Sequence, residues 1–233
     1  MFPFFFWRKP RLQPAELAAL EKWKNLPPPV LNPDFGKSRI VVVDVETSGL
    51  DPKRSSLLAI GAVAVTGGKI CNADSFEIVL KQKEASEAEN IVVHGITGSE
   101  QKEGVPPEEA LLNFLGYLGK DPLVAFHVYF DETAIKRAMK KYLGLRFVHP
   151  WLDMAHIMPA LHPVEAKRLK GLDDWLGLYN LNVWTRHNAL SDAVATAQLL
   201  LIAMERAKTE GAKSFSSLKD IEKAHLWTGR RNV

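Results

Sequence analysis

Residues 39–50 read RIVVVDVETSGL, an apolar run that ends abruptly in acid. The β-branched residues before Asp44 favour a strand that is covered on both faces. Asp44 and Glu46 are two residues apart, so their side chains project from the same face of that strand. Two adjacent carboxylates at the end of a core strand repel each other and require a compensating cation. The plain alternative is that they only mark where the strand reaches solvent.

The elements around this strand predict an α/β domain, a mixed sheet with helices on its faces. Residues 66–69, TGGK, are typical of a hairpin turn. Further strands are expected over 57–65, 70–80, 122–127 and 146–152, and helices over 14–24, 107–119, 131–143, 153–160, 171–178, 189–208 and 216–227. Periodicity does not fix the order of the strands in the sheet.

The chain of 233 residues, with 46% apolar and 24% charged residues, is typical of a globular protein. Three consecutive prolines from Pro27 separate an N-terminal aromatic and basic segment with a short helix (1–37) from the main domain (38–210). Residues 211–233 form a predicted C-terminal helical extension. A single cysteine and a net charge of +3 fit a cytoplasmic protein and permit a polyanionic partner.

The start, MFPFFFWRKPR, is too short to span a bilayer and lacks the arrangement of a signal peptide. Its aromatic and basic side chains could contact a partner or a membrane surface. They could equally fold back onto the domain. No transmembrane segment is expected.

Two further segments place acids where helices begin. Asp131 lies where the strand ending VAFH leads into a helix, and ligands bind at such strand ends in open α/β sheets. Asp192 falls in the first turns of the long helix, behind Asn188 or Ser191 as the helix cap. An Asp at a helix start also interacts favourably with the helix dipole, so each acid alone has a purely structural explanation.

The set of acids carries more information than any one of them. Carboxylates without cysteine favour a hard octahedral cation such as Mg²⁺ or Mn²⁺. Four carboxylates suit two such ions, roughly 4 Å apart, of the kind that act in phosphoryl transfer. His187, in the loop before the long helix, can accept a proton at neutral pH, although a loop histidine is more commonly a surface residue.

Three ordered motifs resemble the DEDDh exonucleases, the DnaQ-like family that includes the proofreading subunit of bacterial replicative polymerase. DVETSGL (44–50) resembles the first motif, AFHVYFD (125–131) the second and RHNALSDA (186–193) the third. The interval from His187 to Asp192 is that of the histidine branch of the family. IVVHGIT (91–97) is similar to a segment that lies near the scissile end of the substrate in the family. The resemblance covers about residues 38–205.

The resemblance implies an RNase H-like fold with a five-stranded mixed sheet. It also implies 3′→5′ hydrolysis of single-stranded ends to nucleoside 5′-monophosphates, with two Mg²⁺ or Mn²⁺ ions. Asp44 would contact both ions, Glu46 and Asp192 would hold the first, and Asp131 would support the second. His187 would be the general base. By the same resemblance, the substrate-binding residues would be Thr47, Ser48, Gly49, Leu50, His94 and Phe130.

One departure concerns the residues before Asp131. Many members of the family have His-Asn where this chain has Phe126 and His127. Neither position holds a metal, so the departure bears on contacts near the substrate. His127 is interpreted either as a hydrogen-bond donor close to the site or as a histidine satisfied at the end of its strand.

Two basic groups could guide a phosphate backbone or simply form solvated surface. They are Lys136, Arg137, Lys140 and Lys141 on the helix after Asp131, and Lys167, Arg168 and Lys170 in a loop.

The leading hypothesis is a DNA exonuclease of the proofreading or repair type, which could join a polymerase or repair complex. One alternative is an RNA-trimming 3′→5′ exoribonuclease, since the same site hydrolyses either polymer. A second is a catalytically silent module that only binds nucleic acid or a partner. The presence of all five catalytic residue types disfavours the silent module.

Overall fold

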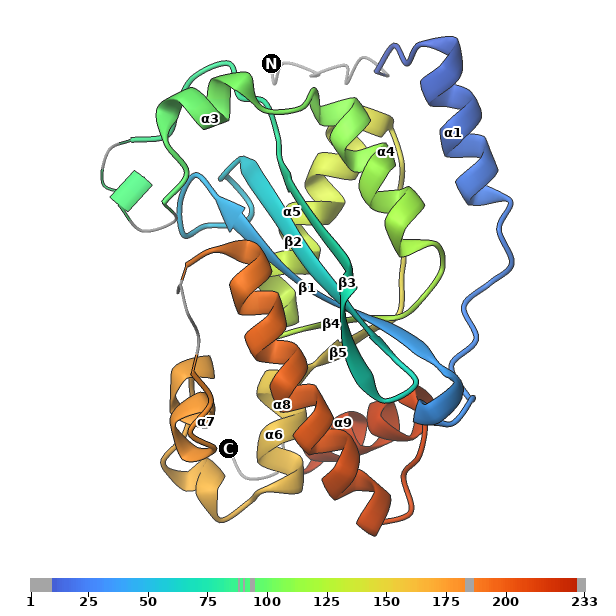
Figure 1. The fold of residues 1–233 in the computed structure, drawn as a ribbon, viewed down its shortest axis with the longest axis vertical. Helices are drawn as coiled ribbons and strands as arrows, with labels where there is room; N and C mark the ends of the chain where they lie inside the picture. Colours follow the sequence, from blue (N-terminus) through green and yellow to red (C-terminus); the bar gives the residue numbers. More distant parts are fainter. Residues whose placement is uncertain (1–9, 88, 90, 93–94, 183–186, 230–233) are drawn as a thin grey trace, which may run out of the picture.

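The computed structural model describes residues 10–87, 89, 91–92, 95–182 and 187–229. Its strands form one five-stranded sheet in the order β3-β2-β1-β4-β5 (Figure 1). The strands are β1 Arg39–Thr47, β2 Leu57–Thr66, β3 Lys69–Val79, β4 Leu123–Ala125 and β5 Trp151–Asp153. β1, β2 and β3 are antiparallel neighbours, whereas β4 pairs in parallel with both β1 and β5. This mixed sheet confirms the predicted α/β class and adds the strand order.

Helices flank the sheet close to the positions that the sequence predicts. They are α1 Pro14–Lys24, α3 Gly98–Glu103, α4 Pro107–Leu118, α5 Val128–Ala138, α6 Met154–Leu161, α7 Leu172–Leu178, α8 Ala189–Thr209 and α9 Phe215–Gly229. Short turns of helix are η1 Phe35–Lys37, η2 Met139–Leu143 and η3 Glu165–Lys167. The short helix α3, which begins with a capping box at Thr97, is absent from the sequence-based prediction.

The boundary between β4 and α5 differs from the prediction. The strand expected over 122–127 ends at Ala125, and the helix begins at Val128 instead of Asp131. His127 adopts a left-handed backbone with φ 67°, which ends the extended chain and starts the helix early. Asp131 therefore lies within the first turn of α5 rather than at its cap.

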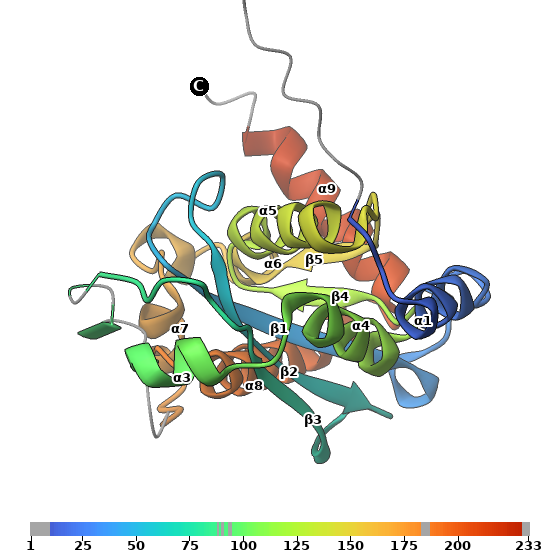
Figure 2. The same cartoon turned by 90° about the horizontal axis from the view of Figure 1, so that it is seen from above.

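The alternation of side chains along β1 divides the core into two layers. Val41, Val43 and Val45 pack with α4 and α5, whereas Ile40 and Val42 pack with α6 and α8. Figure 2 shows α4 and α5 on the opposite side of β1 and β2 from α8. Since side chains two apart share a face, Asp44 and Glu46 continue the row of Ile40 and Val42 toward α8.

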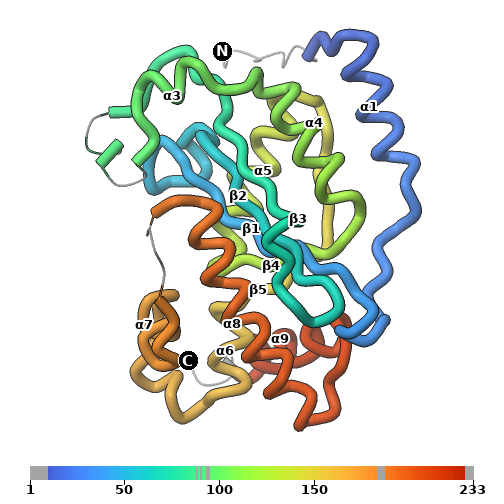
Figure 3. The backbone as a smooth tube through the Cα atoms, in the orientation of Figure 1, coloured from blue at the N-terminus to red at the C-terminus, as the bar shows by residue number. Residues whose placement is uncertain are grey.

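The N-terminal helix packs on the domain instead of standing apart from it. Leu20 and Trp23 of α1 are buried in the layer formed by α4 and α5, and Trp23 Nε1 donates to the Gly119 carbonyl at 2.6 Å. The connector after α1 runs along the molecule to the segment before α9 (Figure 3), where Asp34 and Ser214 form a β-bridge. The boundaries at 37 and 210 stay predictions, and residues 1–9 lie outside the described part of the chain.

Within the described residues, no helix combines the length and the apolar character needed to cross a membrane.

Gly61 of β2 sets how closely α8 approaches the sheet. It lies opposite Asp44 in the pairing of β1 with β2. A Cβ at this position would lie 2.1 Å from the Leu190 backbone nitrogen and 2.2 Å from the Ala189 carbonyl carbon. These atoms form the start of α8, so only glycine lets the helix lie this close to the strand.

Replacing Gly61 with Ala is expected to lower the free energy of unfolding by about 1–3 kcal/mol, because the added methyl group displaces backbone rather than a flexible side chain. Urea denaturation followed by circular dichroism measures this loss. The matched control is Gly116→Ala on the exposed side of α4, where an added Cβ meets nothing within 4 Å. The control should be stabilised by up to about 1 kcal/mol. Equal stability of Gly61→Ala and the unmodified chain would contradict the close approach of α8.

Candidate functional site

Three carboxylates from two elements meet where β1 ends. Asp44 and Glu46 of β1 and Asp192 of α8 each offer an oxygen, and the three oxygens lie within 4.8 Å of one another. Asp192 is buried, with 6% of its surface exposed, and the two β1 acids are half-buried. Such a group of hard, negatively charged oxygens has the chemistry of a divalent cation site. The residues present therefore fit the Mg²⁺ or Mn²⁺ that the sequence predicts.

The start of α8 is fixed by hydrogen bonds around the cluster. The Asn188 side chain caps the helix by accepting from the Ser191 N–H at 2.9 Å, as one of the two predicted caps. Its amide nitrogen donates to Glu77 Oε1 on β3 at 3.0 Å, which ties the helix start to the sheet. The His187 N–H donates to Asp192 Oδ2 at 3.2 Å. The first two bonds fix the start of α8, and the third orients the Asp192 carboxylate.

His187 lies at the edge of the cluster. Its backbone is left-handed, with φ 59°, and its side chain is exposed. The hydrogen bond from its backbone to Asp192 keeps the residue beside the carboxylates. The preceding residues 183–186, including the first residue of the third motif, lie outside the described part of the chain.

Asp131 approaches the same strand from the other layer. β4 pairs with β1 only at Val41 and Val42, so the edge of β1 is open farther along. There the Asp131 Oδ1 accepts the Val45 N–H at 3.1 Å and takes the place of a neighbouring strand. Burial raises the pKa of Asp131 well above its ordinary value, and the nearby charges of Asp153 and Glu46 raise it further. Hydrogen bonds from backbone N–H groups oppose this shift.

The predicted substrate loop after Glu46 is ordered by its own hydroxyl groups. Thr47 Oγ1 donates to the Gly49 carbonyl at 2.6 Å, and Ser48 Oγ accepts from the Ser56 N–H at 2.9 Å. Leu50 projects into solvent with 89% of its surface exposed. Within this loop, Leu50 is therefore the side chain most available to a ligand.

The other two predicted substrate-binding residues are Phe130 and His94. Phe130 is partly buried and packs against the layer formed by α4 and α5. His94 lies outside the described residues, so its predicted contact with the substrate stays a prediction.

His127 serves the fold through its backbone. Its side chain is exposed, while its N–H donates to Asp153 Oδ1 at 3.0 Å. A left-handed conformation costs roughly 1–2 kcal/mol for most residues, and Asn tolerates it better than others. A hydrogen bond to a charged group contributes about 1.5–3 kcal/mol, which offsets that cost. At position 127, where many members of the family have Asn, the structure therefore requires a residue whose backbone is left-handed.

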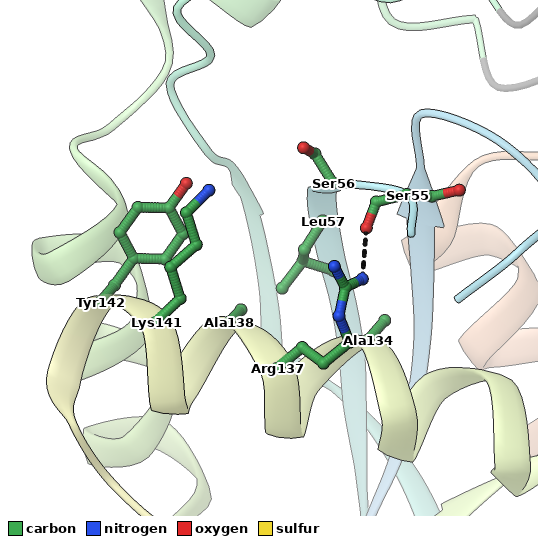
Figure 4. Close-up of a pocket in the computed structure, with 8 residues that line it drawn as sticks. All are labelled: Ser55, Ser56, Leu57, Ala134, Arg137, Ala138, Lys141 and Tyr142. Atoms are coloured by element: carbon green, nitrogen blue, oxygen red, sulfur yellow. Dashed lines mark hydrogen bonds between the residues drawn. The ribbon is translucent and has the colours of Figure 1, made fainter. Parts of the chain in front are cut away.

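The basic residues after Asp131 have mixed roles. Arg137 donates to the carbonyls of Pro52 at 2.7 Å and Ser55 at 2.8 Å, and so fixes the loop between β1 and β2 (Figure 4). Lys136 pairs with Glu132 at 2.6 Å. Both cations therefore have partners within the fold, and their contact with a phosphate backbone stays a prediction.

A hollow of about 460 Å³ lies beside Arg137, where Lys141 and Tyr142 stand side by side (Figure 4). It adjoins a larger hollow of about 990 Å³, and the two share Ser56, Lys141 and Tyr142. The larger hollow is lined by Lys81 and Lys83 but also by Glu84, Glu87 and Glu108. Its charge is therefore mixed. In the second basic group, the Lys170 ammonium donates to the Ala166 carbonyl at 3.0 Å.

Comparison with known proteins places this site in a family. The model of a family described as Exonuclease matches residues 41–200, a span that contains all the acids of the site. The chain belongs to this exonuclease family. This result confirms the family resemblance that the three motifs indicate.

Relatives in sequence include proteins named DNA polymerase III PolC-type and DNA polymerase III subunit epsilon. DNA polymerase III PolC-type of Thermotoga maritima is 31% identical over 188 residues, which cover 81% of this chain but only 13% of that protein. DNA polymerase III subunit epsilon of Aquifex aeolicus is 28% identical over 185 residues, covering 78% of this chain and 89% of that one. The chain thus spans about an eighth of its PolC-type relatives and corresponds to most of the epsilon subunit.

The fold also matches solved structures of exonucleases. E. coli exonuclease I in complex with a dT13 oligonucleotide has a TM-score of 0.63 at 16% identity, over 74% of this chain and 42% of that one. Exonuclease X in complex with 5′ overhanging duplex DNA has a TM-score of 0.61 at 22% identity, over 78% of this chain and 99% of that one. These likenesses confirm the predicted RNase H-like fold.

Geometry adds one residue to the site that the motifs do not contain. Gly61 lies outside all three motifs but allows Asp192 to reach the β1 acids. The signal in the sequence is a lone glycine inside the strand LLAIGAVAV, which indicates a close approach of other backbone.

Asp131→Asn is expected to stabilise the metal-free protein above neutral pH. The pKa of Asp131 is raised on folding, so ionisation of its carboxyl destabilises the folded state as the pH rises through the folded pKa. Asparagine keeps an acceptor for the Val45 N–H and carries no charge. The melting temperature at pH 8 in EDTA should rise by a few degrees, since 1 kcal/mol corresponds to roughly 2–4 °C in a chain of this size.

The difference should vanish at a pH well below the unfolded pKa of an Asp, about 3.9, where the Asp131 carboxyl is uncharged in both the folded and the unfolded chain. Asp220→Asn, at an exposed position of α9, is the matched control and should melt like the unmodified chain. An Asp131→Asn variant that melts at or below the unmodified chain at pH 8 would contradict the buried-charge account.

Proposed function

We propose that this chain is a divalent-metal-dependent 3′→5′ exonuclease that removes nucleoside 5′-monophosphates from single-stranded DNA ends by a two-metal mechanism. The observation that carries the proposal is the meeting of Asp44, Glu46 and Asp192 within 4.8 Å in a chain of the exonuclease family. A purely structural role would not require three carboxylates to be held this close, because their mutual repulsion opposes folding.

The acids are assigned to the metals as follows. Asp44, Glu46 and Asp192 would hold one cation, and Asp44 with Asp131 would hold the other. Bound Mg²⁺ or Mn²⁺ supplies the charge that activates an attacking water and stabilises the leaving oxygen of the phosphodiester. The raised pKa of Asp131 is a property of the metal-free chain, since a nearby cation favours the ionised carboxylate.

His187 is the proposed general base. Its backbone N–H donates to Asp192 Oδ2, and the residue is exposed, so its imidazole is accessible to solvent close to the carboxylates. A neutral imidazole can accept the proton of the attacking water and so act as a general base.

The terminal nucleotide would lie against the loop of residues 47–50. The internal hydrogen bonds of Thr47 and Ser48 hold the loop in one shape, and Leu50 presents an apolar surface to a base. Phe130 and His94 complete the proposed contacts. A loop that is ordered before binding loses less entropy when the substrate arrives.

DNA is the favoured polymer, and a polymerase or repair complex is the favoured setting. The support is that relatives are named DNA polymerase III PolC-type and subunit epsilon, and that two of the structural neighbours are complexes with DNA. RNA is the second candidate, because the same kind of site hydrolyses either polymer and discrimination between them comes from contacts to the 2′-hydroxyl.

The test uses single-stranded DNA and RNA of one sequence, labelled at the 5′ end, with Mg²⁺, Mn²⁺ or EDTA. The expected product is a ladder of labelled DNA shortened from its 3′ end, formed with metal and absent with EDTA. Immediate release of labelled mononucleotide would instead reveal 5′→3′ attack. No cleavage of either polymer with either metal would remove the enzyme proposal.

Two variants separate the roles within the site. Asp44→Asn should abolish cleavage, and Asp220→Asn on α9 should leave it unchanged. His187→Ala should lower kcat about 10²–10⁴-fold. It should also remove the decline of activity at acidic pH that protonation of a histidine base produces. A His187→Ala variant with an unchanged pH profile would exclude His187 as the base.

A further inference from the structure

A buried carboxylate that none of the three motifs contains joins the elements around the site. Asp153 ends β5 and has 9% of its surface exposed. Its Oδ1 accepts the N–H groups of His127 at 3.0 Å and Ala155 at 2.9 Å, and its Oδ2 accepts that of Val128 at 3.0 Å. Asp153 therefore caps α6 and, with the same carboxylate, holds the first residues of α5.

The residues that Asp153 holds determine where Asp131 lies. His127 and Val128 form the turn that leads from β4 into α5, and the left-handed backbone of His127 requires support. Asp131 follows in the first turn and accepts the N–H of Val45, between Asp44 and Glu46 on β1. Any shift of the start of α5 therefore displaces Asp131 relative to the other acids.

The C-terminal helix supports Asp153 in turn. Glu222 of α9 has 3% of its surface exposed, and its Oε1 accepts the Asp153 N–H at 2.9 Å. The Lys219 ammonium donates to the other oxygen of Glu222. This pair lies beyond residues 41–200, the span that matches the exonuclease family.

We propose that Asp153 is a positioning residue for Asp131 and that Glu222 links the C-terminal helix to it. The chain of contacts runs from Glu222 to Asp153, through the turn at His127 and Val128, to Asp131 and the N–H of Val45. The effect on catalysis rests on the proposed nuclease function, whereas the effect on the position of Asp131 does not.

The direct test is amide hydrogen exchange followed by NMR in Asp153→Asn. An asparagine places an amide NH₂ against at least one of the three N–H donors, so part of the support is lost. Exchange should accelerate at least about tenfold at Val128 and also at Val45. Unchanged protection of Val45 would show that Asp131 has not moved and would overturn the proposal, whether or not the chain cleaves DNA.

Asp174→Asn is the matched control, because Asp174 also accepts two consecutive backbone N–H groups, those of Lys170 at 2.8 Å and Gly171 at 2.9 Å. It serves α7 and has no such link to Asp131. Exchange of Val45 should remain that of the unmodified chain. Acceleration of Val45 in this control as well would mean that general loosening explains the effect, and would also overturn the proposal.

Glu222 provides a milder second test if Asp153→Asn fails to fold. Glu222→Ala removes the acceptor of the Asp153 N–H, whereas Glu222→Gln retains an oxygen there. The alanine variant should accelerate exchange at Val128 and Val45, the glutamine variant should restore most of the protection, and Asp220→Ala on the same helix should change neither amide. Equal effects of alanine and glutamine would exclude Glu222 as the link.

Activity supplies the last readout. Asp153→Asn should lower kcat about 10–100-fold and weaken Mn²⁺ binding, with a smaller change in KM. In an Asp131→Asn background it should cause little further loss, because its effect passes through Asp131. A full additional loss in that background would show that Asp153 acts by another route.

Discussion

Electrostatic repulsion among three carboxylates is the constraint around which the site is built. The carboxylate oxygens lie within 4.8 Å of one another. At that separation two unit charges repel by roughly 3.5 kcal/mol at an effective dielectric constant of about 20, and solvent lowers this value for the half-buried Asp44 and Glu46. The fold must hold Asp192 against that force. It does so because Gly61 lets α8 lie directly on β2 and because Asn188 ties the start of α8 to Glu77. A divalent cation would convert the repulsion into attraction, so stability lost in the metal-free chain is recovered on binding.

The two helices that carry site acids begin in the same unusual way. His127 before α5 and His187 before α8 both have left-handed backbones, and each donates its N–H to a carboxylate. The acceptors are Asp153 and Asp192. Left-handed conformations persist at non-glycine residues only where surrounding contacts compensate them, and such positions cluster at functional sites. The sharp turns bring each helix start up to the end of β1, so backbone strain contributes directly to the placement of the acids.

Much of this arrangement was predictable from local sequence patterns. The alternation in residues 39–46 predicts the face on which Asp44 and Glu46 lie, and helical spacing predicts α8 and its cap. The early start of α5 was not predictable, because it depends on a left-handed His127 that a distant carboxylate supports. Asp153 and Glu222 were not predicted, for the same reason: their hydrogen-bond partners are far away in the sequence. Asp153 and His127 are 26 residues apart, and Glu222 and Asp153 are 69 residues apart. Gly61 indicates a close approach of other backbone, but the sequence does not show which helix covers β2.

The proposed chemistry requires that Asp44, Glu46 and Asp192 together bind a divalent cation. Crystals grown with Mn²⁺ and measured at the manganese absorption edge test it without reference to any substrate. The expected result is an anomalous peak at the end of β1, within bonding distance of an oxygen from each of the three carboxylates. Crystals that diffract well and show no peak there at saturating Mn²⁺, or a peak bound by other residues alone, would contradict it.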